Sequence, residues 1–315
     1  MTNDLFKPIG DILPAIIKRH KPLTPIQRRL ITMSPEDEDE ASILFQHTIL
    51  CQTSMPYKDP GDDIRTWKRQ NGHAALQIQA GAAYDSTAKD FVDVGLPHGA
   101  KPRLVLYHLN AEAIKTQSPV LELEDSLTAF VRRTLGLDPG GRNIKTVKDQ
   151  LTRLAAADFR FGMERDGRAV TIKSTVISGF ELWSPKNDKQ RVLWPTTVQF
   201  SRDYFDSLMN HAVPLNEAAI TRLSHSPIAL DIYTWLAQRL HRINPKRAAF
   251  VPWVSLRQQF GEGYGRMDNF KAAFRRTLKQ VHTVYPHATF SLDGKGMTLR
   301  HSRPPVARRL LPISG

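Results

Sequence analysis

A segment near the C-terminus, residues 270–286, alternates apolar and polar side chains with the period of an α-helix. Its sequence is FKAAFRRTLKQVHTVYP, and Phe270, Phe274, Leu278 and Val281 recur at intervals of three or four residues. Side chains with this spacing lie on one face of a helix. The pattern therefore predicts a helix that buries this aromatic and aliphatic face against the rest of its domain.

The residues around this helix predict a complete folding unit. Before it lie a long amphipathic segment at about 227–242, a shorter helical segment within 253–261 and the glycine-rich sequence GEGYG. After it, ATFSLDGKGMTLRHS has the alternation of a β-hairpin with its turn at Asp293-Gly294. Two helices, a basic helix and a β-hairpin, in that order, are typical of a winged helix. That motif is a helix-turn-helix with a hairpin beside its second helix.

A similar order of elements is predicted upstream. The pattern indicates three helices and then a β-hairpin, at about 102–116, 126–135, 142–158 and 159–183, with the hairpin turn at Asp166-Gly167. The segment 41–95 precedes these elements, and it contains a buried apolar stretch and two strands around an Asn71-Gly72 turn. The repeated order favours two units of related architecture.

The sequence thus predicts an α+β fold with two tandem winged-helix domains, preceded by a mostly disordered N-terminal tail. Residues 1–40 contain five prolines and blocks of like charge with few apolar side chains, a composition that favours disorder. Residues 41–210 are expected to form the N-terminal winged-helix domain, in which the extra strands of 41–95 would serve dimerisation. Residues 211–306 are expected to form the C-terminal domain, and 307–315 a second tail.

The composition is that of a folded protein, since 41% of the 315 residues are hydrophobic and 24% are charged. No stretch reaches the roughly 20 apolar residues of a membrane span. Prolines and basic residues interrupt the N-terminal segment where a signal peptide needs an apolar core. The single cysteine, Cys51, cannot form an internal disulfide, which fits the reducing cytosol. We therefore expect a cytoplasmic protein with no membrane association.

The net charge of +13 is concentrated toward the C-terminus. Residues 1–95 carry 11 basic and 13 acidic side chains, a net charge of −2, and residues 96–210 carry 17 and 13, a net charge of +4. Residues 211–315 carry 16 and 5, a net charge of +11. A general solubility charge is one interpretation. The steep gradient favours a dedicated domain that binds a polyanion.

The helix over 270–286 carries a face of one charge sign. Lys271, Arg275, Arg276 and Lys279 lie opposite its apolar face, and the segment contains no carboxylate. A duplex presents its phosphates first, and basic side chains neutralise them. We expect this helix to enter the major groove of DNA, with Arg275, Arg276 and Lys279 as phosphate contacts that position the protein. A solvated basic helix in a structural domain is the alternative.

Residues at the start of this helix and in the hairpin extend the predicted DNA surface. Arg266 and Asn269 lie where side chains usually meet base edges, and Arg pairs with guanine as Asn pairs with adenine. Asn269 would alternatively be an ordinary helix-start residue. Lys295, Arg300 and Arg303 lie on or just after the hairpin and are expected to contact the DNA backbone or the minor groove.

The corresponding helix of the first unit carries a weaker version of the same pattern. Its polar face and first turn contain five candidate DNA-binding residues: Arg142, Asn143, Lys145, Thr146 and Lys148. Asp149 and Asp158 dilute the positive charge. We expect contact with DNA here, and a purely packing or dimerising role is the alternative.

The residue patterns of DNA-processing enzymes are missing from the sequence. None of the eleven histidines forms the His-x-His pair of a metal-dependent nickase. None is followed three positions later by Arg, so the His-x-x-Arg motif of many tyrosine recombinases is also missing. The one Gly-Lys pair, Gly294-Lys295, lacks the rest of a P-loop. One cysteine is too few for a cysteine zinc site. We therefore expect no catalytic residue, no metal and no cofactor.

Several segments together resemble the plasmid-encoded RepA family of replication initiators. They are LPHGAKPRL (96–104), LTAFVRRTLGL (127–137), GGRNIKTVKDQLTRLAAADF (140–159), HSPIALDIYTWLAQRL (225–240), FVPWVSLRQQFGEGY (250–264), FKAAFRRTLKQVHTVYP (270–286) and GMTLRHSRPPV (296–306). The resemblance covers about 41–306. Its most specific part is the combination of VPW…QFG, the F-x-x-x-F basic helix that follows and the closing SRPPV.

The resemblance implies a non-enzymatic initiator with tandem winged helices. Such proteins bind repeated sites, called iterons, at a plasmid origin, help to melt adjacent A·T-rich DNA and recruit host replication proteins, including the host initiator and the replicative helicase. In relatives the C-terminal unit reads the major groove, while the N-terminal unit supports dimerisation and contacts neighbouring DNA. Dimers often repress their own promoter, which contributes to plasmid copy control, and monomers initiate.

Two other functions stay open at this point. The first is a two-domain transcriptional repressor without a replication role, which the same DNA-binding surfaces would serve. The second is a strand-cleaving initiator with an unusual active site, which the missing His-x-His pair disfavours.

Overall fold

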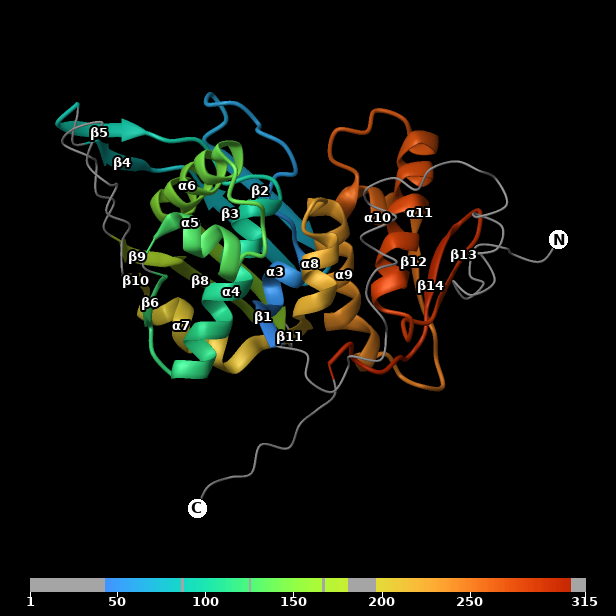
Figure 1. The fold of residues 1–315 in the computed structure, drawn as a ribbon. Helices are drawn as coiled ribbons and strands as arrows, with labels where there is room; N and C mark the ends of the chain where they lie inside the picture. Colours follow the sequence, from blue (N-terminus) through green and yellow to red (C-terminus); the bar gives the residue numbers. More distant parts are fainter. Residues whose placement is uncertain (1–42, 86–87, 125, 166–167, 181–196, 307–315) are drawn as a thin grey trace, which may run out of the picture.

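The computed structural model describes residues 43–85, 88–124, 126–165, 168–180 and 197–306 (Figure 1). The two predicted tails, 1–40 and 307–315, lie outside the described residues, as does the predicted turn at 166–167. The described chain is a mixed α+β structure, as the sequence predicted.

The C-terminal unit has the predicted order of elements. It contains α9 (Pro227–Arg239), η4 (Leu240–Arg242), β12 (Ala249–Pro252), α10 (Trp253–Phe260), α11 (Met267–Val284), β13 (Phe290–Leu292) and β14 (Gly296–Leu299). The hairpin β13–β14 turns at Asp293-Gly294, as predicted. The short strand β12 was not anticipated, and it pairs antiparallel with β14 to give the sheet order β12-β14-β13. The helix-turn-helix and its hairpin are therefore joined through one small sheet.

The apolar face predicted for α11 is the buried face. Phe270, Phe274, Leu278 and Val281 are at most 1% exposed. The rings of Phe270 and Phe274 contact the Trp253 ring edge to face, with centroids 6.2 and 5.8 Å away. This aromatic cluster fixes α11 against α10 and leaves the opposite helix face to solvent.

The N-terminal unit is larger than a winged helix. Its elements are β1 (Ile43–His47), α3 (Thr48–Gln52), β2 (Thr66–Asn71), β3 (Ala74–Gln79), β4 (Ala82–Asp85), β5 (Asp90–Asp93), α4 (Ala100–Thr116), β6 (Val120–Glu122), α5 (Leu127–Ala129), η3 (Phe130–Thr134), α6 (Gly141–Ala156), β7 (Asp158–Arg165), β8 (Arg168–Thr175), β9 (Ile177–Phe180), β10 (Thr197–Phe200), α7 (Arg202–His211), β11 (Ala212–Asn216) and α8 (Glu217–Leu223). The three predicted helices correspond to α4, α5 with the π-helical turn η3, and α6. The predicted hairpin around Asn71-Gly72 is β2–β3.

The hairpin β7–β8 differs from a simple wing. It belongs to a four-stranded sheet of order β2-β3-β7-β8, and β6 pairs with β10 instead of with this hairpin. The cause is the alternation of buried side chains on neighbouring strands. Leu76 and Ile78 of β3 lie opposite Phe161 and Phe159 of β7 in the antiparallel register, and all four are buried. The extra strands of 41–95 thus enlarge the predicted wing into a sheet that covers the core.

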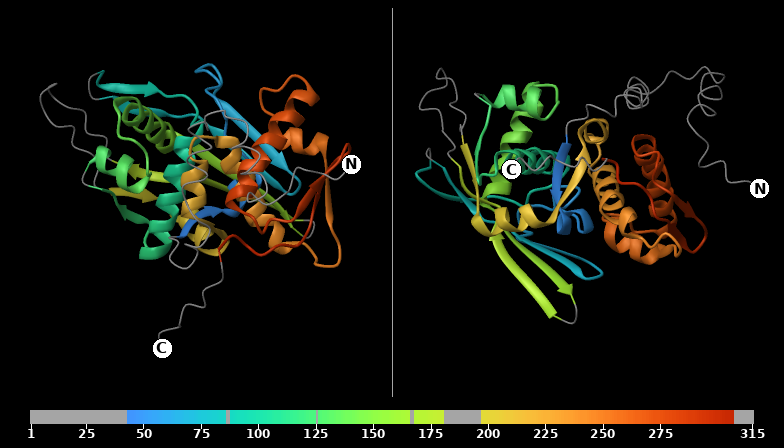
Figure 2. Two further views of the ribbon diagram at one scale, coloured as in Figure 1. Left: turned by 45° about the vertical axis from the view of Figure 1, so that its right-hand side comes forward. Right: turned by 90° about the horizontal axis from the view of Figure 1, so that it is seen from below.

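The two units share one hydrophobic core. β1 pairs antiparallel with β11, with Ile43 opposite Asn216, so the start of the described chain closes against a strand beyond the expected boundary at residue 210. Helix α9 packs on α3 and α4 on one side and on α11 on the other, and it lies between the two groups of elements in Figures 1 and 2. The two surfaces predicted to meet DNA are therefore carried by a continuous body.

No helix in the described part of the chain is long and apolar enough to cross a lipid bilayer.

Candidate nucleic-acid interface

The solvent-facing side of α11 carries a row of four exposed residues. Asn269, Ala272, Arg276 and Lys279 follow one another at helical spacing and are all exposed. The row runs from the first turn of the helix to its fourth. A small side chain, Ala272, lies between a polar residue and two cations. This row is therefore a solvent-exposed stripe along α11.

The other two cations of the predicted basic face lie against Trp253. Lys271 Nζ lies 5.3 Å and Arg275 Cζ lies 5.0 Å from the centre of the indole ring, within the range of cation–π attraction. The indole Nε1 donates to the Asp293 carbonyl at 3.0 Å, and Lys271 Nζ donates to the Gly294 carbonyl at 3.4 Å. Lys271 and Arg275 are only half exposed. The predicted basic face therefore consists of an exposed row and a second row that ties α11 to the hairpin.

The start of α11 carries an exposed ion pair. Arg266, the residue before the first turn, donates from Nε to Asp268 Oδ1 at 3.1 Å and from Nη2 to Asp268 Oδ2 at 2.7 Å. Asp268 Oδ1 also accepts from the backbone N–H of Asn269 at 3.0 Å. The hydrogen bonds from Arg266 and then from Asn269 lower the pKa of the Asp268 carboxyl, so the group is ionised at neutral pH. The sequence prediction named Arg266 and Asn269 but not the carboxylate between them.

The predicted hairpin cations occupy two separate places. Lys295 is exposed in the β13–β14 turn, close to the point where Lys271 reaches Gly294. Arg300 and Arg303 are exposed beyond the other end of β14, where Arg303 Nη2 lies 2.8 Å from His287 Nε2. Asp293 holds the turn by accepting from the backbone N–H groups of Lys295 and Gly296 at 2.7 and 2.8 Å. Lys295 therefore belongs with the start of α11, and the two arginines with its C-terminal end.

In the first unit, the N-terminal half of α6 carries the predicted residues. Arg142 and Lys145 are exposed and Lys148 is half exposed. Asn143 Nδ2 and Thr146 Oγ1 are used within the chain, because they donate to the carbonyls of Asp138 and Arg142 at 2.8 Å each. Among the described residues, the side chains of the three cations make no such bond, while Asn143 and Thr146 each use one donor hydrogen there and remain predicted contacts.

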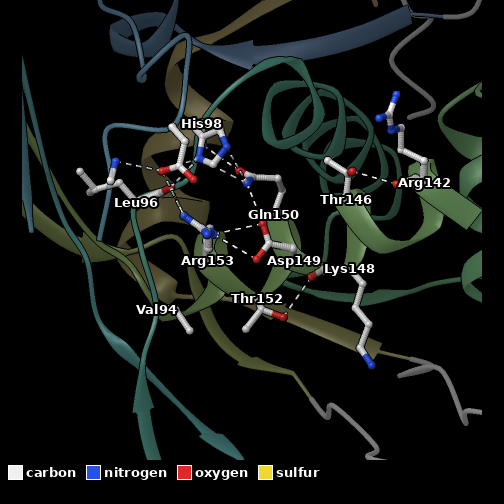
Figure 3. A network of polar contacts seen from close by, with 12 residues as sticks. Val94, Leu96, His98, Arg142, Thr146, Lys148, Asp149, Gln150, Thr152 and Arg153 are labelled. Atoms are coloured by element: carbon white, nitrogen blue, oxygen red, sulfur yellow. Dashed lines mark hydrogen bonds and ion pairs between the residues drawn. The ribbon is translucent and has the colours of Figure 1, made fainter. Parts of the chain in front are cut away.

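The C-terminal half of α6 is neutralised by a polar network (Figure 3). Arg153 bonds Asp149 at 3.1 Å and lies 3.6 Å from Asp59 in a neighbouring loop. Gln150 Oε1 accepts from the backbone N–H of His98 at 2.7 Å. Arg142 and Lys148 point away from this network in Figure 3. The basic part of α6 is therefore confined to its first turns.

Sequence reasoning missed three residues of this surface, namely Asp268, Ala272 and Trp253. Asp268 lies just outside the segment whose lack of carboxylates defined the basic face. Ala272 is too small to stand out in an analysis of charge. Trp253 was expected only as the first residue of a helical segment, and its short sequence distance from the basic helix was the one signal for its contact with Lys271 and Arg275.

The order of elements in the C-terminal unit defines an α+β chain of the helix-turn-helix type with an exposed cationic helix surface. The chain belongs to the family of plasmid-encoded RepA proteins, whose model matches residues 96–254. The matched region contains α6 and ends at the first turn of α10, so the basic helix α11 lies outside it.

Two solved structures are similar to this chain over most of their length, at low sequence identity. One contains domains 2 and 3 of RctB as a selenomethionine derivative, with a TM-score of 0.49 and 10% sequence identity, and covers 81% of this chain and 98% of its own. The other contains RctB residues 155–483, also domains 2–3, with a TM-score of 0.48 and 10% identity, and covers 80% of this chain and 94% of its own. No curated protein sequence matches this chain significantly.

Proposed function

We propose that this chain is a sequence-specific double-stranded DNA-binding protein that initiates plasmid replication. It would bind iterons at the origin, promote local melting of neighbouring DNA and recruit host replication proteins, among them the host initiator and the replicative helicase. Membership of the plasmid-encoded RepA family supports a role in plasmid replication. The proposed activity rests on binding and needs neither a catalytic residue nor a cofactor, and its place is the cytoplasm.

The exposed row on α11 is the observation that carries this proposal. The major groove of B-DNA is about 12 Å wide and admits one α-helix. A helix that enters it needs a buried face to hold it and an exposed face free of bulky apolar groups, and α11 has both. Arg276 and Lys279 would contact phosphates, while Asn269 would reach a base edge at the groove floor. Lys295 at the hairpin turn would contact the adjacent backbone.

The second basic surface, on α6, fits a protein that distorts DNA. Arg142, Lys145 and Lys148 would add phosphate contacts from the N-terminal unit. Two contact surfaces on one chain make the second binding event intramolecular, which raises the overall affinity. Because the two units share a core, the relative placement of α6 and α11 is fixed before binding. If straight DNA cannot reach α6 and α11 at the same time, the protein would bind bent or unwound DNA more tightly than straight DNA.

A salt titration tests the DNA-binding part of this proposal. The variant Arg276→Ala with Lys279→Ala should weaken binding to every duplex, and the slope of log K against log salt should become shallower by roughly two units, one for each lost phosphate contact. Lys68→Ala with Arg160→Ala is the matched control, because it removes two exposed cations from the four-stranded sheet, far along the chain from α11. Equal slopes for all three proteins would rule out α11 as the phosphate-binding helix.

A plasmid assay tests the replication part and separates it from the alternative of a transcriptional repressor. The gene would be placed with its flanking DNA, including any direct repeats of about two helical turns that the protein protects from cleavage. Replication in a suitable host supports an initiator. Tight binding to the repeats without replication would support the repressor.

Dimerisation belongs to the same proposal, and it has a candidate surface. Among the described residues, three exposed large apolar side chains, Tyr84, Phe91 and Val92, gather on the β4–β5 hairpin, which projects from the N-terminal unit in Figure 1. The rings of Tyr84 and Phe91 contact each other edge to face at 5.6 Å. A two-stranded hairpin is marginally stable alone, so a second copy of the chain would stabilise it. Tyr84→Ser with Phe91→Ser should lower the dimer fraction in sedimentation, and an unchanged fraction would exclude this hairpin.

A further inference from the structure

The Arg266–Asp268 pair uses only one of the two bidentate edges of the guanidinium group. Asp268 accepts from Nε and Nη2, which together form the side edge of the group. The end edge consists of Nη1 and the second hydrogen of Nη2. Within the described part of the chain, this end edge makes no hydrogen bond. A planar fork held along one edge has its other edge fixed in direction.

The free end edge matches one partner in the major groove. Guanine presents two neighbouring acceptors there, O6 and N7, and an arginine that donates to both is the commonest specific contact with DNA. Arg266 precedes the first turn of α11, and its side chain is 77% exposed. It is therefore placed where a groove-binding helix first meets the bases, and no movement of Asp268 is needed for it to donate.

The position of Asp268 is otherwise unfavourable for binding DNA. Its side chain is 61% exposed on a helix that would approach phosphates, and a carboxylate there repels them. Its bond to the Asn269 N–H and its charge in the first turn stabilise the start of the helix, but Asn could accept the same bond without repelling phosphates. The cost of a negative charge at this position is explained if the charge orients Arg266.

We propose that Asp268 is a positioning residue that directs the end edge of the Arg266 guanidinium to O6 and N7 of a guanine in the DNA site. This inference rests on the proposed function, since it requires α11 to lie in the major groove. Asp268 itself would discriminate against bases other than guanine indirectly, by restricting the orientations of Arg266.

The test uses the full-length protein and duplexes selected from a pool with a randomised segment of about two helical turns. The selected duplex is then compared with versions in which single guanines are replaced by adenine or by 7-deazaguanine, which lacks the N7 acceptor. Asp268→Ala should lower affinity for the selected duplex by about tenfold and abolish the preference for guanine at one position. Its affinity for random duplexes should not fall, because a repulsive charge has been removed.

Three comparisons keep the result decisive. Asp268→Asn retains an acceptor for the Asn269 N–H, so it separates orientation of Arg266 from helix capping, and it should also lose the guanine preference. Arg266→Ala should lose the same preference, and adding Asp268→Ala to it should cost no further discrimination. Asp206→Ala is the matched control, because it also removes the aspartate of an exposed arginine–aspartate ion pair. In that pair the side chains of Arg202 and Asp206 are 77% and 52% exposed.

The possible failures are distinguishable. A guanine preference that persists in both Asp268 variants overturns this inference and leaves the proposed function intact. Equal losses on selected and random duplexes assign Asp268 a purely structural role and likewise overturn it. A wild-type protein that enriches no sequence from the pool overturns the proposed function and this inference together.

Discussion

Ala272 lies at the centre of the exposed row on α11, and its size sets how closely the helix can approach another molecule. Asn269 lies one turn before it and Arg276 one turn after it. A methyl group at this place allows the helix axis to come close to the groove floor, and Ala can contact the C5 methyl group of thymine. The smallest side chain of the row is therefore as informative as its cations.

Ala272→Glu should lower affinity for a selected duplex by tenfold or more, because it adds bulk and a negative charge where phosphates and base edges approach. The free energy of unfolding should stay within about 0.5 kcal/mol of the wild-type value, since the position is exposed and Glu is a good helix former. Binding and urea unfolding measured on the same preparations check both statements. Ala248→Glu, an exposed change in the loop before β12, is the matched control and should leave both quantities unchanged.

At the scale of residues, helical spacing predicted which side chains of α11 are buried. It did not predict the contacts that side chains make between elements. The buried positions Phe270 and Phe274 follow from helical spacing alone. The contact of Arg275 with the Trp253 ring joins two elements, and the edge of Arg266 that Asp268 occupies depends on side-chain torsions. Neither can be deduced from the order of residues, because both depend on the packed structure.

The β12–β14–β13 sheet shows how an element depends on one position. A Cβ atom added at Gly296 would lie 2.3 Å from the Val251 carbonyl oxygen and 2.8 Å from Phe250 Cζ. Gly296 pairs with Pro252, the residue before α10. The absence of a side chain at Gly296 therefore lets the hairpin lie against β12 and hold the start of α10.

Gly296→Ala should destabilise the protein by about 1–3 kcal/mol, because the backbone of β12 must shift to admit the methyl group. Urea unfolding measures this change. Gly294→Ala, two residues away in the turn, is the control, since a Cβ atom there would meet nothing within 4 Å. Similar losses in the two variants would contradict the packing argument.

At the scale of elements, the order of the helices could be predicted from the sequence, whereas the pairing of the strands could be predicted only in part. The helices α4, α6, α9, α10 and α11 and the turn at Asp293-Gly294 were all predicted from spacing and turn residues. Strand β12 has four residues and ends in proline, so it carries too little signal to be recognised. The pairing of β3 with β7 joins residues far apart in the chain, and alternation alone does not specify a partner.

Across the whole molecule, the two units are joined by a buried ion pair. Arg103 of α4 donates to both carboxylate oxygens of Asp231 of α9, at 2.7 and 2.8 Å, and also to the carbonyls of Met55 and Gly99. The two side chains are 1% and 6% exposed. Burial alone would lower the pKa of the Arg103 guanidinium, but Asp231 raises it, so Arg103 keeps its charge. Charge, hydrogen bonds and geometry all fix α4 against α9.

Asp231→Ala should destabilise the protein by about 3–5 kcal/mol, because it leaves the buried Arg103 charge without a partner. Arg103→Met with Asp231→Leu should cost much less, since no unpaired charge remains. Breaking the exposed Arg202–Asp206 pair with Asp206→Ala should cost no more than about 1 kcal/mol. Chemical unfolding of the wild type and these three variants tests the ranking of their losses in stability. A loss for Asp231→Ala as small as that for the double variant would contradict it.

The stability of the whole molecule should also fall in acid. Burial and then the neighbouring His211 lower the pKa of His47 from 6.5 to about 3. Between these values the unfolded chain binds a proton at this residue that the folded chain does not. The free energy of unfolding should therefore decrease as the pH drops below 6.5, by about 1.4 kcal/mol per pH unit for this group.

Urea unfolding between about pH 4 and pH 6 measures this slope, within the interval that the two pKa values define. The ring Nδ1 of His47 accepts from the Ile49 N–H at the start of α3, and His47→Asn retains an acceptor there while removing the titrating group. The variant should lose stability less steeply with falling pH. Parallel curves would show that His47 does not contribute to the acid sensitivity.

The pairing of β1 with β11 has a consequence for how the chain is made. Ile43 finds its partner only at Asn216, so β1 leaves the ribosome long before the strand that completes its ladder exists. Until then the nascent chain presents an open edge of backbone donors and acceptors, the kind of edge on which chains aggregate. Heating or overproduction should therefore expose this segment to chaperones first, and a chain that stops before β11 should be recovered as insoluble material.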